Sequence, residues 1–319
     1  MENKKQFQDV IPYALRSVPY ILQSHVFKAY CALENLYVHR PNLPQSVWVY
    51  CTSLIQNDEP KVTGLIAANL LDIDEIVDET SGRDFGPDWI LARGLMPLSY
   101  WAMHKKVKEF GFSKIFQNYL EQTLDHPILL GHEISVLAGN WQFYTQVIAQ
   151  GSSSEDEALF LQRFTEFVTT TFAHNNDTFF DHPQIDQVPS AKEILKEALH
   201  NPGFFGHNIL ACVWAERIKD LLSPKQYQKM LYNLTVLVRW HEFGKPPNIL
   251  QVMPCSWTDA DLDEALATFF HQGPKNIHQI TLAEVLVSTW IHFPEYRDEV
   301  ASNILCFTQG TRPISAPEI

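Results

Sequence analysis

Four histidines stand where the sequence predicts the starts of buried helices, and imidazole is a side chain that binds transition metals and transfers protons near neutral pH. Residues 129–134 (LLGHEI) and 204–209 (FFGHNI) share one pattern, which is two apolar residues, Gly, His, any residue and Ile. Their histidines are His132 and His207. His25 and His278 likewise precede apolar helical runs. We therefore predict one metal where His25, His132, His207 and His278 converge.

Alternative roles exist for each of these side chains. Taken singly, such a histidine is more often a satisfied core or interface residue than a metal ligand. Four together favour a shared role, because burying four imidazoles separately is costly. All-nitrogen sites suit iron, copper, zinc and nickel alike. Glu133 and Glu284 lie near two of the histidines and are candidates for oxygen ligands, or equally for a helix cap or a surface charge.

Aromatic residues near these histidines are the candidate substrate-binding residues. We expect Trp141, Phe204, Phe205 and Trp214 to shape an apolar pocket for a planar molecule, beside a metal that activates O₂. The same side chains are also typical of an ordinary helical core. A third interpretation is a haem-binding bundle, in which His132 or His207 is an axial ligand.

Motifs for other enzyme classes are missing from the sequence. It contains no Gly-rich phosphate loop after a strand, no Gly-x-Ser-x-Gly and no His-Glu-x-x-His. One Glu-x-x-His occurs at residues 197–200, whereas ferritin-like di-iron bundles use two. Hydrolase, kinase and nucleotide-binding folds therefore lack support.

The composition narrows the partners. The 319 residues include 24 basic and 37 acidic side chains, for a net charge of -13, which disfavours nucleic acid and anionic membrane surfaces. No signal-like segment and no uninterrupted apolar run of about 18 residues occurs, so we predict a cytoplasmic protein with no membrane span. The five cysteines form no Cys-x-x-Cys pair, which argues against a disulfide framework and a thiolate zinc site.

The elements that must position the histidines are predicted to be helices. Apolar residues recur with helical spacing nearly everywhere and never with a clear period of two. We predict an all-α fold, with a single multi-helix domain over residues 1–309, built around the buried histidine-bearing helices, and a loose tail over 310–319. Helices are expected over 61–79 and over 89–110, the second with a kink at Pro97. Expected helix starts lie at the following residues: Pro87, Ser113, Ser190, Ser223 and Thr258.

The order of the histidine motifs resembles the questin oxidase-like family. Residues 24–29 (SHVFKA), 131–134 (GHEI), 206–209 (GHNI) and 278–281 (HQIT) match the four histidine segments of that family in order. Residues 109–120 also resemble the family's lead-in to its second histidine. The likeness extends over most of the chain, although each motif is short.

The resemblance implies an all-helical oxygenase that opens a ring of an aromatic polyketide-like small molecule, such as an anthraquinone, with O₂. It also implies non-haem iron (Fe) held by the four histidines and a carboxylated lysine. The chain departs from the family here, because Thr281 stands where the pattern has the lysine, and the nearest lysine is Lys275. NADPH is a candidate electron donor, and the sequence does not indicate the oligomeric state. The alternative function is a metal-free helical binding or scaffold protein derived from the same fold.

Overall fold

The computed structural model describes residues 7–18, 24–65, 86–125, 129–173, 185–240 and 249–310. Within these ranges the fold is helical, and the β pairing is limited to an isolated bridge between Ser17 and Lys61. The predicted all-α class is therefore confirmed. The helix expected over 61–79 does not begin at Lys61, and most of its range lies outside the described residues, as does nearly all of the expected tail.

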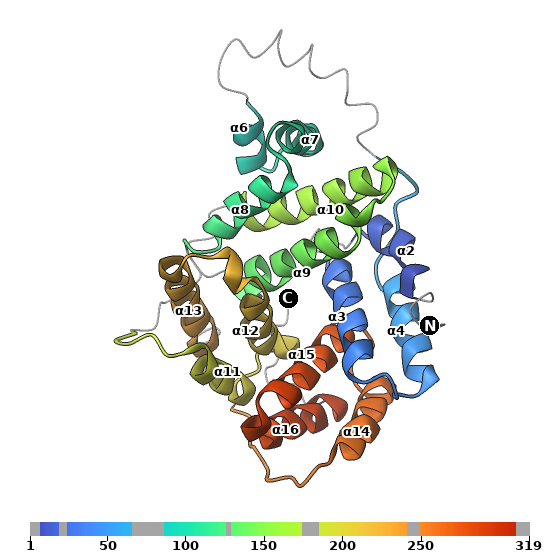
Figure 1. Cartoon of the computed structure of the whole chain (residues 1–319), viewed down its shortest axis with the longest axis vertical. Coiled ribbons are helices and arrows are strands. Elements are labelled where there is room, and N and C mark those ends of the chain that lie inside the picture. The colour runs from blue at the N-terminus through green and yellow to red at the C-terminus, as the bar shows by residue number, and fades with distance from the viewer. Residues whose placement is uncertain are drawn as a thin grey trace.

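Four helices form the centre of the molecule, and each begins at one of the predicted histidines. They pack in a closed ring in which α3 contacts α9 and α15, and α12 contacts the same two helices (Figure 1). The ring brings their N-terminal ends together. Their bounds are α3 Val26–His39, with His25 as the N-cap, α9 His132–Gln146, α12 His207–Ile218 and α15 His278–His292.

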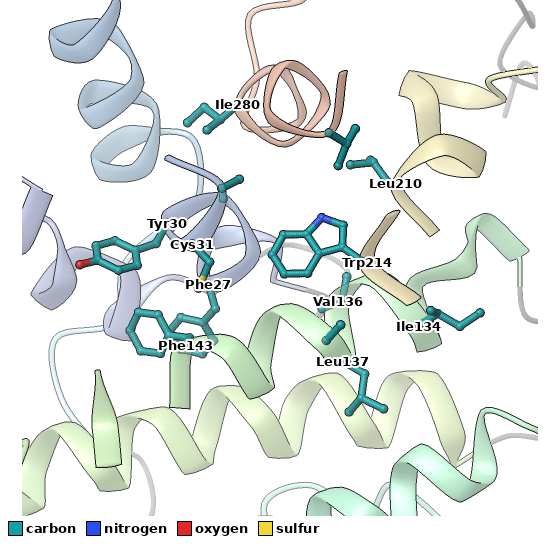
Figure 2. Close-up of a cluster of buried hydrophobic side chains, with 14 of the residues drawn as sticks. Phe27, Tyr30, Cys31, Ile134, Val136, Leu137, Phe143, Leu210, Trp214 and Ile280 are labelled. Carbon is teal, nitrogen blue, oxygen red and sulfur yellow. The ribbon is translucent and has the colours of Figure 1, made fainter. Parts of the chain in front are cut away.

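The space between these four helices is filled with apolar side chains. Figure 2 shows the indole of Trp214 from α12 among side chains from the other three helices. Burial of each large side chain contributes about 1.5–3 kcal/mol, so this packing fixes how the four helices lie against one another. The labelled residues are Phe27, Tyr30, Cys31, Ile134, Val136, Leu137, Phe143, Leu210, Trp214 and Ile280.

The remaining helices surround the ring. α10 packs across α7 and α9, α11 and α13 cover α12, and α14 and α16 pack on each other, with α16 also against α15 (Figure 1). None of the helices in the described ranges is long and apolar enough to cross a membrane. The bounds are α2 Ile11–Arg16, α4 Gln45–Asn57, α6 Pro87–Ala92, α7 Leu98–Phe110, α8 Phe112–Gln122, α10 Ser154–Phe172, α11 Ala191–His200, α13 Pro224–Arg239, α14 Asp259–Gln272 and α16 Arg297–Thr308.

Most of the predicted helix starts are confirmed. Ser190, Ser223 and Thr258 each accept a hydrogen bond from the third residue of the helix that follows, whose side chain bonds back to the cap. These reciprocal capping boxes satisfy two backbone donors that a helix leaves unpaired. Pro87 occupies the first turn of α6, where its missing N–H is not needed.

Two predicted boundaries are wrong. Gly111, with a φ of 77°, ends α7 and also serves as the N-cap of α8, so Ser113 is not the cap. The expected helix over 89–110 is not kinked but divided into α6 and α7, because Gly94 is left-handed with a φ of 59° and Pro97 cannot continue a helix.

Candidate metal centre

The repeated pattern before His132 and His207 is a repeated backbone turn. Leu130 and Gly131 have φ values of 68° and 62°, and Phe205 and Gly206 have φ values of 48° and 77°. Each pair is therefore left-handed, a conformation that is strained for any residue with a Cβ. The chain turns sharply at both places and enters a helix whose first residue is the histidine. The repeated sequence motif thus corresponds to the same backbone conformation at both places.

The two glycines also allow neighbouring helices to approach closely. A Cβ on Gly131 would lie 2.8 Å from the side chains of Ala211 and Leu237, and one on Gly206 would lie 2.5 Å from Leu282 Cδ1. Ala211 lies one turn beyond His207, and Leu282 lies one turn beyond His278. The turn before one histidine therefore packs directly on the next histidine-bearing helix.

The other two histidines are positioned by a pair of carboxylates at the end of α4. Glu59 accepts hydrogen bonds from the backbone N–H of His25, at 3.2 Å, and from the Ser24 hydroxyl, at 2.9 Å. Asp58 accepts one from the backbone N–H of Ile277, at 3.2 Å. Carboxylates are favoured near the unpaired N–H groups of helix starts. Two adjacent residues thereby hold the starts of α3 and α15 side by side.

Three imidazole nitrogens meet at the centre of this arrangement. Nε2 of His132 lies 3.1 Å from Nε2 of His25 and 3.0 Å from Nε2 of His207. Ligand nitrogens of all three residues lie within 4.8 Å of one another, and all three side chains are buried. Two nitrogens bound to one ion at about 2.1 Å, at right angles, are about 3.0 Å apart, so the spacing fits a common ion.

The two close contacts cannot both be full hydrogen bonds while the rings are neutral. The Nδ1–H of His207 donates to the carbonyl oxygen of Phe204, which leaves Nε2 of the neutral ring as an acceptor. His132 Nε2 carries either a proton or a lone pair in its one in-plane position. A proton there is directed at His207 or shared between His207 and His25, and a lone pair there faces the lone pair of His207. A cation between the rings would instead bind one lone pair from each of them.

Burial keeps these rings in the neutral form that binds metals. Desolvation lowers the pKa of His25 and His132 well below the usual value, with further lowering from the neighbouring imidazoles. Burial likewise lowers the pKa of His207 to about 3. At neutral pH each of these rings is neutral and can offer one nitrogen lone pair to a metal ion.

His278 lies beside the trio without joining it. Its ring centroid is 4.5 Å from that of His25 and 5.1 Å from that of His207. The group of mutually close ligand nitrogens does not include His278, and this residue as a whole is more exposed than the other three. Desolvation, followed by the charge of His207, lowers its pKa well below the usual value. The structure therefore brings all four predicted rings together, with three nitrogens in metal-binding geometry.

Two of the four predicted substrate-binding residues lie at this cluster. Phe204 stacks on His207 with a centroid distance of 6.1 Å, and Phe205 stacks on His278 at 5.4 Å. Trp214 lies seven residues beyond His207, about 10 Å along α12, within the core (Figure 2). Trp141 lies nine residues beyond His132, about 13 Å along α9. Its ring stacks on Phe116 of α8, with a centroid distance of 4.4 Å.

Sequence reasoning missed Lys28, the one lysine in the described part of the chain whose side chain is fully buried. Lys28 Nζ donates a hydrogen bond to Ser135 Oγ at 3.3 Å. The Lys28 side chain packs directly on Gly139, because a Cβ added to Gly139 would lie only 2.6 Å from the Cβ of Lys28. Its charge lowers the pKa of all four histidines, and burial lowers its own pKa to about 7. A lysine inside the apolar run 26–33 was the available signal.

The structure also places the residues at which the sequence suggested an oxygen ligand or a carboxylated lysine. The Thr281 hydroxyl donates to the carbonyl of His278, and Lys275 Nζ donates to the carbonyl of Phe270 at 3.1 Å. Glu284 is fully buried in an ion pair with Arg217, and Glu133 is fully buried. The lysine nearest the histidines therefore comes from α3, three residues after His25.

Comparison with known proteins returns nothing: no protein-family model matches the chain, and neither the curated proteins nor the solved structures include a similar one. The questin oxidase-like resemblance, the aromatic substrate and the cytoplasmic location therefore stay predictions. The polar sequence around His174, His182 and His241 predicts that they face solvent, with a pocket mouth as the alternative for His174 or His182, and all three lie outside the described residues.

The close approach at Gly206 can be tested with a matched control. Gly206 and Gly151 are both left-handed, with ψ values of 18° and 39°, but a Cβ on Gly151 meets nothing within 4 Å. We expect Gly151→Ala to lower the free energy of unfolding by about 1–2 kcal/mol through backbone strain alone. Gly206→Ala should lower it by about 1–3 kcal/mol more, through the clash with Leu282. Urea unfolding measures both, and equal losses would contradict the packing role.

Lys28 gives the metal-free protein a defined pH dependence. The folded pKa of about 7 is below the unfolded value, so between pH 7 and pH 10.5 the unfolded chain binds more protons and stability rises with pH. From pH 7 to 9.5 the gain from this one group is about 3 kcal/mol. Lys28→Met should remove that gain and leave the contributions of other groups. The check is urea unfolding of both proteins at the two pH values, and parallel pH profiles would contradict the assignment.

Proposed function

We propose that this chain binds one transition-metal ion through His25, His132 and His207 and uses it in an O₂-dependent oxidation of an aromatic small molecule. The observation that carries the proposal is the meeting of three buried Nε2 atoms at separations of 3.0–3.1 Å and within 4.8 Å overall. Buried polar atoms normally have partners, and a cation would give each of these three nitrogens a full one. The donor set suits iron, copper, zinc and nickel.

Iron is the metal we favour, because the resemblance to questin oxidase-like proteins implies it. His25, His132 and His207 would hold such an ion without filling its coordination sphere, as the three protein ligands of other non-haem iron oxygenases do. A bound iron(II) ion would supply the electron that O₂ requires to react with an organic molecule. The aromatic polyketide-like substrate and NADPH as electron donor follow from the same resemblance.

The residues around the site would orient its metal-binding nitrogens, limit the access of water and hold a proton. The carbonyl of Phe204 fixes the tautomer of His207 and thus the direction of its lone pair. Phe204 and Phe205 cover the imidazoles with apolar rings, which limits water at the site. Lys28 Nζ, with a pKa of about 7, can hold or release a proton at neutral pH. Together these features favour an oxidation that excludes bulk solvent.

Metal binding is the primary test. Full-length protein, purified without an affinity tag and titrated anaerobically with Fe(II), should take up one equivalent. At a free metal concentration of 100 times Kd it should gain about 2.7 kcal/mol of stability. His132→Gln should weaken metal binding by about 100-fold or more, because Nε2 of His132 makes the close contacts with both His25 and His207.

His39→Gln is the matched control, because His39 ends the same helix that His25 begins. It should bind metal like the unchanged protein. Uptake below about a tenth of an equivalent, or equal binding by the His132 variant, would favour the metal-free scaffold. A Soret band in the purified protein would favour haem.

The oxidation can be tested separately from metal binding. An oxygen electrode should record O₂ uptake by Fe(II)-loaded protein when a hydroxylated anthraquinone is added, with and without NADPH. We expect uptake in the unchanged protein and in His39→Gln, and loss of at least about 90% of it in His132→Gln, since the ion is then lost. Normal metal binding without O₂ uptake on a panel of such aromatics would retain the metal centre and refute the proposed oxidation.

A further inference from the structure

A cavity lies along the later turns of α3, away from the histidine at the start of that helix. Its volume is about 630 Å³, which is within the range of pockets that hold small organic molecules. Its walls come from the start of α2, from α3, and from the end of α9 with the turn that follows, and these segments pack on one another. We call it the α2–α3–α9 cavity.

The spacing of side chains along α3 explains how one helix reaches both the histidine cluster and this cavity. His25 is the N-cap of α3, whereas Tyr30, Glu34 and Tyr37 recur at intervals of three or four residues and therefore share one face. Figure 2 shows the ring of Tyr30 pointing away from Trp214. The cavity therefore lies beside the four-helix ring and not within it.

Glu34 gives the cavity a negative charge. It is the one formally charged side chain among the described residues that line the cavity. Burial, followed by the charge of Glu34, raises the pKa of Tyr30, so the phenol stays protonated at neutral pH and adds no charge. α9 ends at Gln146, which also lines the cavity, so the negative end of the α9 dipole adds to the charge of Glu34. The cavity therefore favours a cation.

Aromatic rings form the apolar part of the same cavity. Phe7 and Tyr37 meet edge to face, with their ring centroids 5.3 Å apart and an interplanar angle of 79°. Phe7 and Tyr30 are each exposed by only 1%, so they form the deep side of the cavity. Such rings pack favourably on another aromatic ring and attract a cation to their faces. A matching ligand therefore combines an aromatic body with a positively charged end.

From these observations we propose that the α2–α3–α9 cavity binds an arylalkylamine, whose ammonium group pairs with Glu34 and whose ring packs against Phe7 and Tyr37. The ammonium donates charge-assisted hydrogen bonds to the Glu34 carboxylate, whereas an anion of the same shape is repelled by it. The inference does not rest on the proposed metal centre, because the described lining residues include none of its three histidines.

The test compares three probes by ligand-observed NMR titration of the full-length protein. Phenylbutylammonium, phenylbutanol and phenylpentanoate share a phenylbutyl body and differ in the group at its end. We expect the ammonium to bind about tenfold more tightly than the alcohol, through one partly buried ion pair and a cation–π contact, and the carboxylate to bind more weakly than the alcohol. Equal affinities of the ammonium and the alcohol, or no probe with a Kd below about 10 mM, would overturn the proposal.

A pair of variants tests the role of Glu34. Glu34→Gln keeps the shape of the side chain and removes its charge, so the affinity for the ammonium should fall about tenfold, to that of the alcohol, while the affinity for the alcohol stays the same. Glu109→Gln is the matched control, because it removes the same charge from an exposed position on α7. It should leave all three affinities unchanged. An unchanged affinity for the ammonium in Glu34→Gln would refute the assignment.

A further variant covers the case in which Glu34→Gln does not fold. Gln146 is exposed at the end of α9 and lines the cavity, so Gln146→Trp should fill part of the cavity without disturbing the core. Both the ammonium and the alcohol should then bind about tenfold more weakly or not at all. Unchanged binding would place the probes elsewhere on the protein and contradict the proposal.

A last probe separates a free amine from a lysine side chain of another protein. Nα-acetyl-lysine amide carries an ammonium group on a peptide-like body without an aromatic ring. It should bind more weakly than phenylbutylammonium, because it lacks the ring that packs against Phe7 and Tyr37. The reverse order would assign the cavity to a protein lysine and overturn the arylalkylamine.

Discussion

The interaction on which this structure depends is the mutual approach of three buried imidazole nitrogens. Burial removes the solvent that would hydrate them and lowers the pKa of each ring, so protonation does not relieve the contact. The carbonyl of Phe204 fixes the tautomer of His207, and His132 Nε2 then cannot make a full hydrogen bond to both of its neighbours. A fold that maintains such a contact must hold it by packing from all sides, and the ring of α3, α9, α12 and α15 provides that packing.

The four helix starts are brought together by two different devices. His132 and His207 follow left-handed turns whose glycines let the backbone press against Ala211 and Leu282. The starts of α3 and α15 are instead tied to Asp58 and Glu59, two adjacent carboxylates at the end of α4. The first device is local in sequence and the second is not. Both place a histidine in the first turn of a helix, where its side chain reaches the common centre.

This difference explains what the sequence could and could not predict. The helical class and the histidine-bearing helices follow from periodicity, and several caps follow from a Ser or Thr three residues ahead of an acidic or amide residue. Both are local signals. The LLGH and FFGH segments likewise indicated two related helix starts. The function of Glu59 depends on a contact across 34 residues with His25, for which no local signal exists.

Contacts at longer range decided the other departures from expectation. Trp214 is an aromatic residue on a histidine-bearing helix, which is why we expected it to line a pocket. It lies seven residues beyond His207, and the rise of the helix places it in the core and not at the histidines (Figure 2). Lys28 was recognisable as a charged residue in an apolar run. Its proximity to all four imidazoles follows from the packing of α3 against α9 at Gly139, which a linear sequence does not show.

The charges around the centre indicate which exogenous ligands it would favour. All three nitrogen donors are neutral, so they do not cancel the charge of a divalent ion. Four helix N-termini converge on the same point, each equivalent to about half a positive charge, and the Lys28 ammonium adds to them when protonated. In a buried space this positive potential is weakly screened, which lowers the pKa of any acidic ligand that enters. A phenolic substrate would therefore bind as its phenolate, the electron-rich form that reacts most readily with an oxidant, and this links the electrostatics of the helix starts to the oxidation proposed for the site.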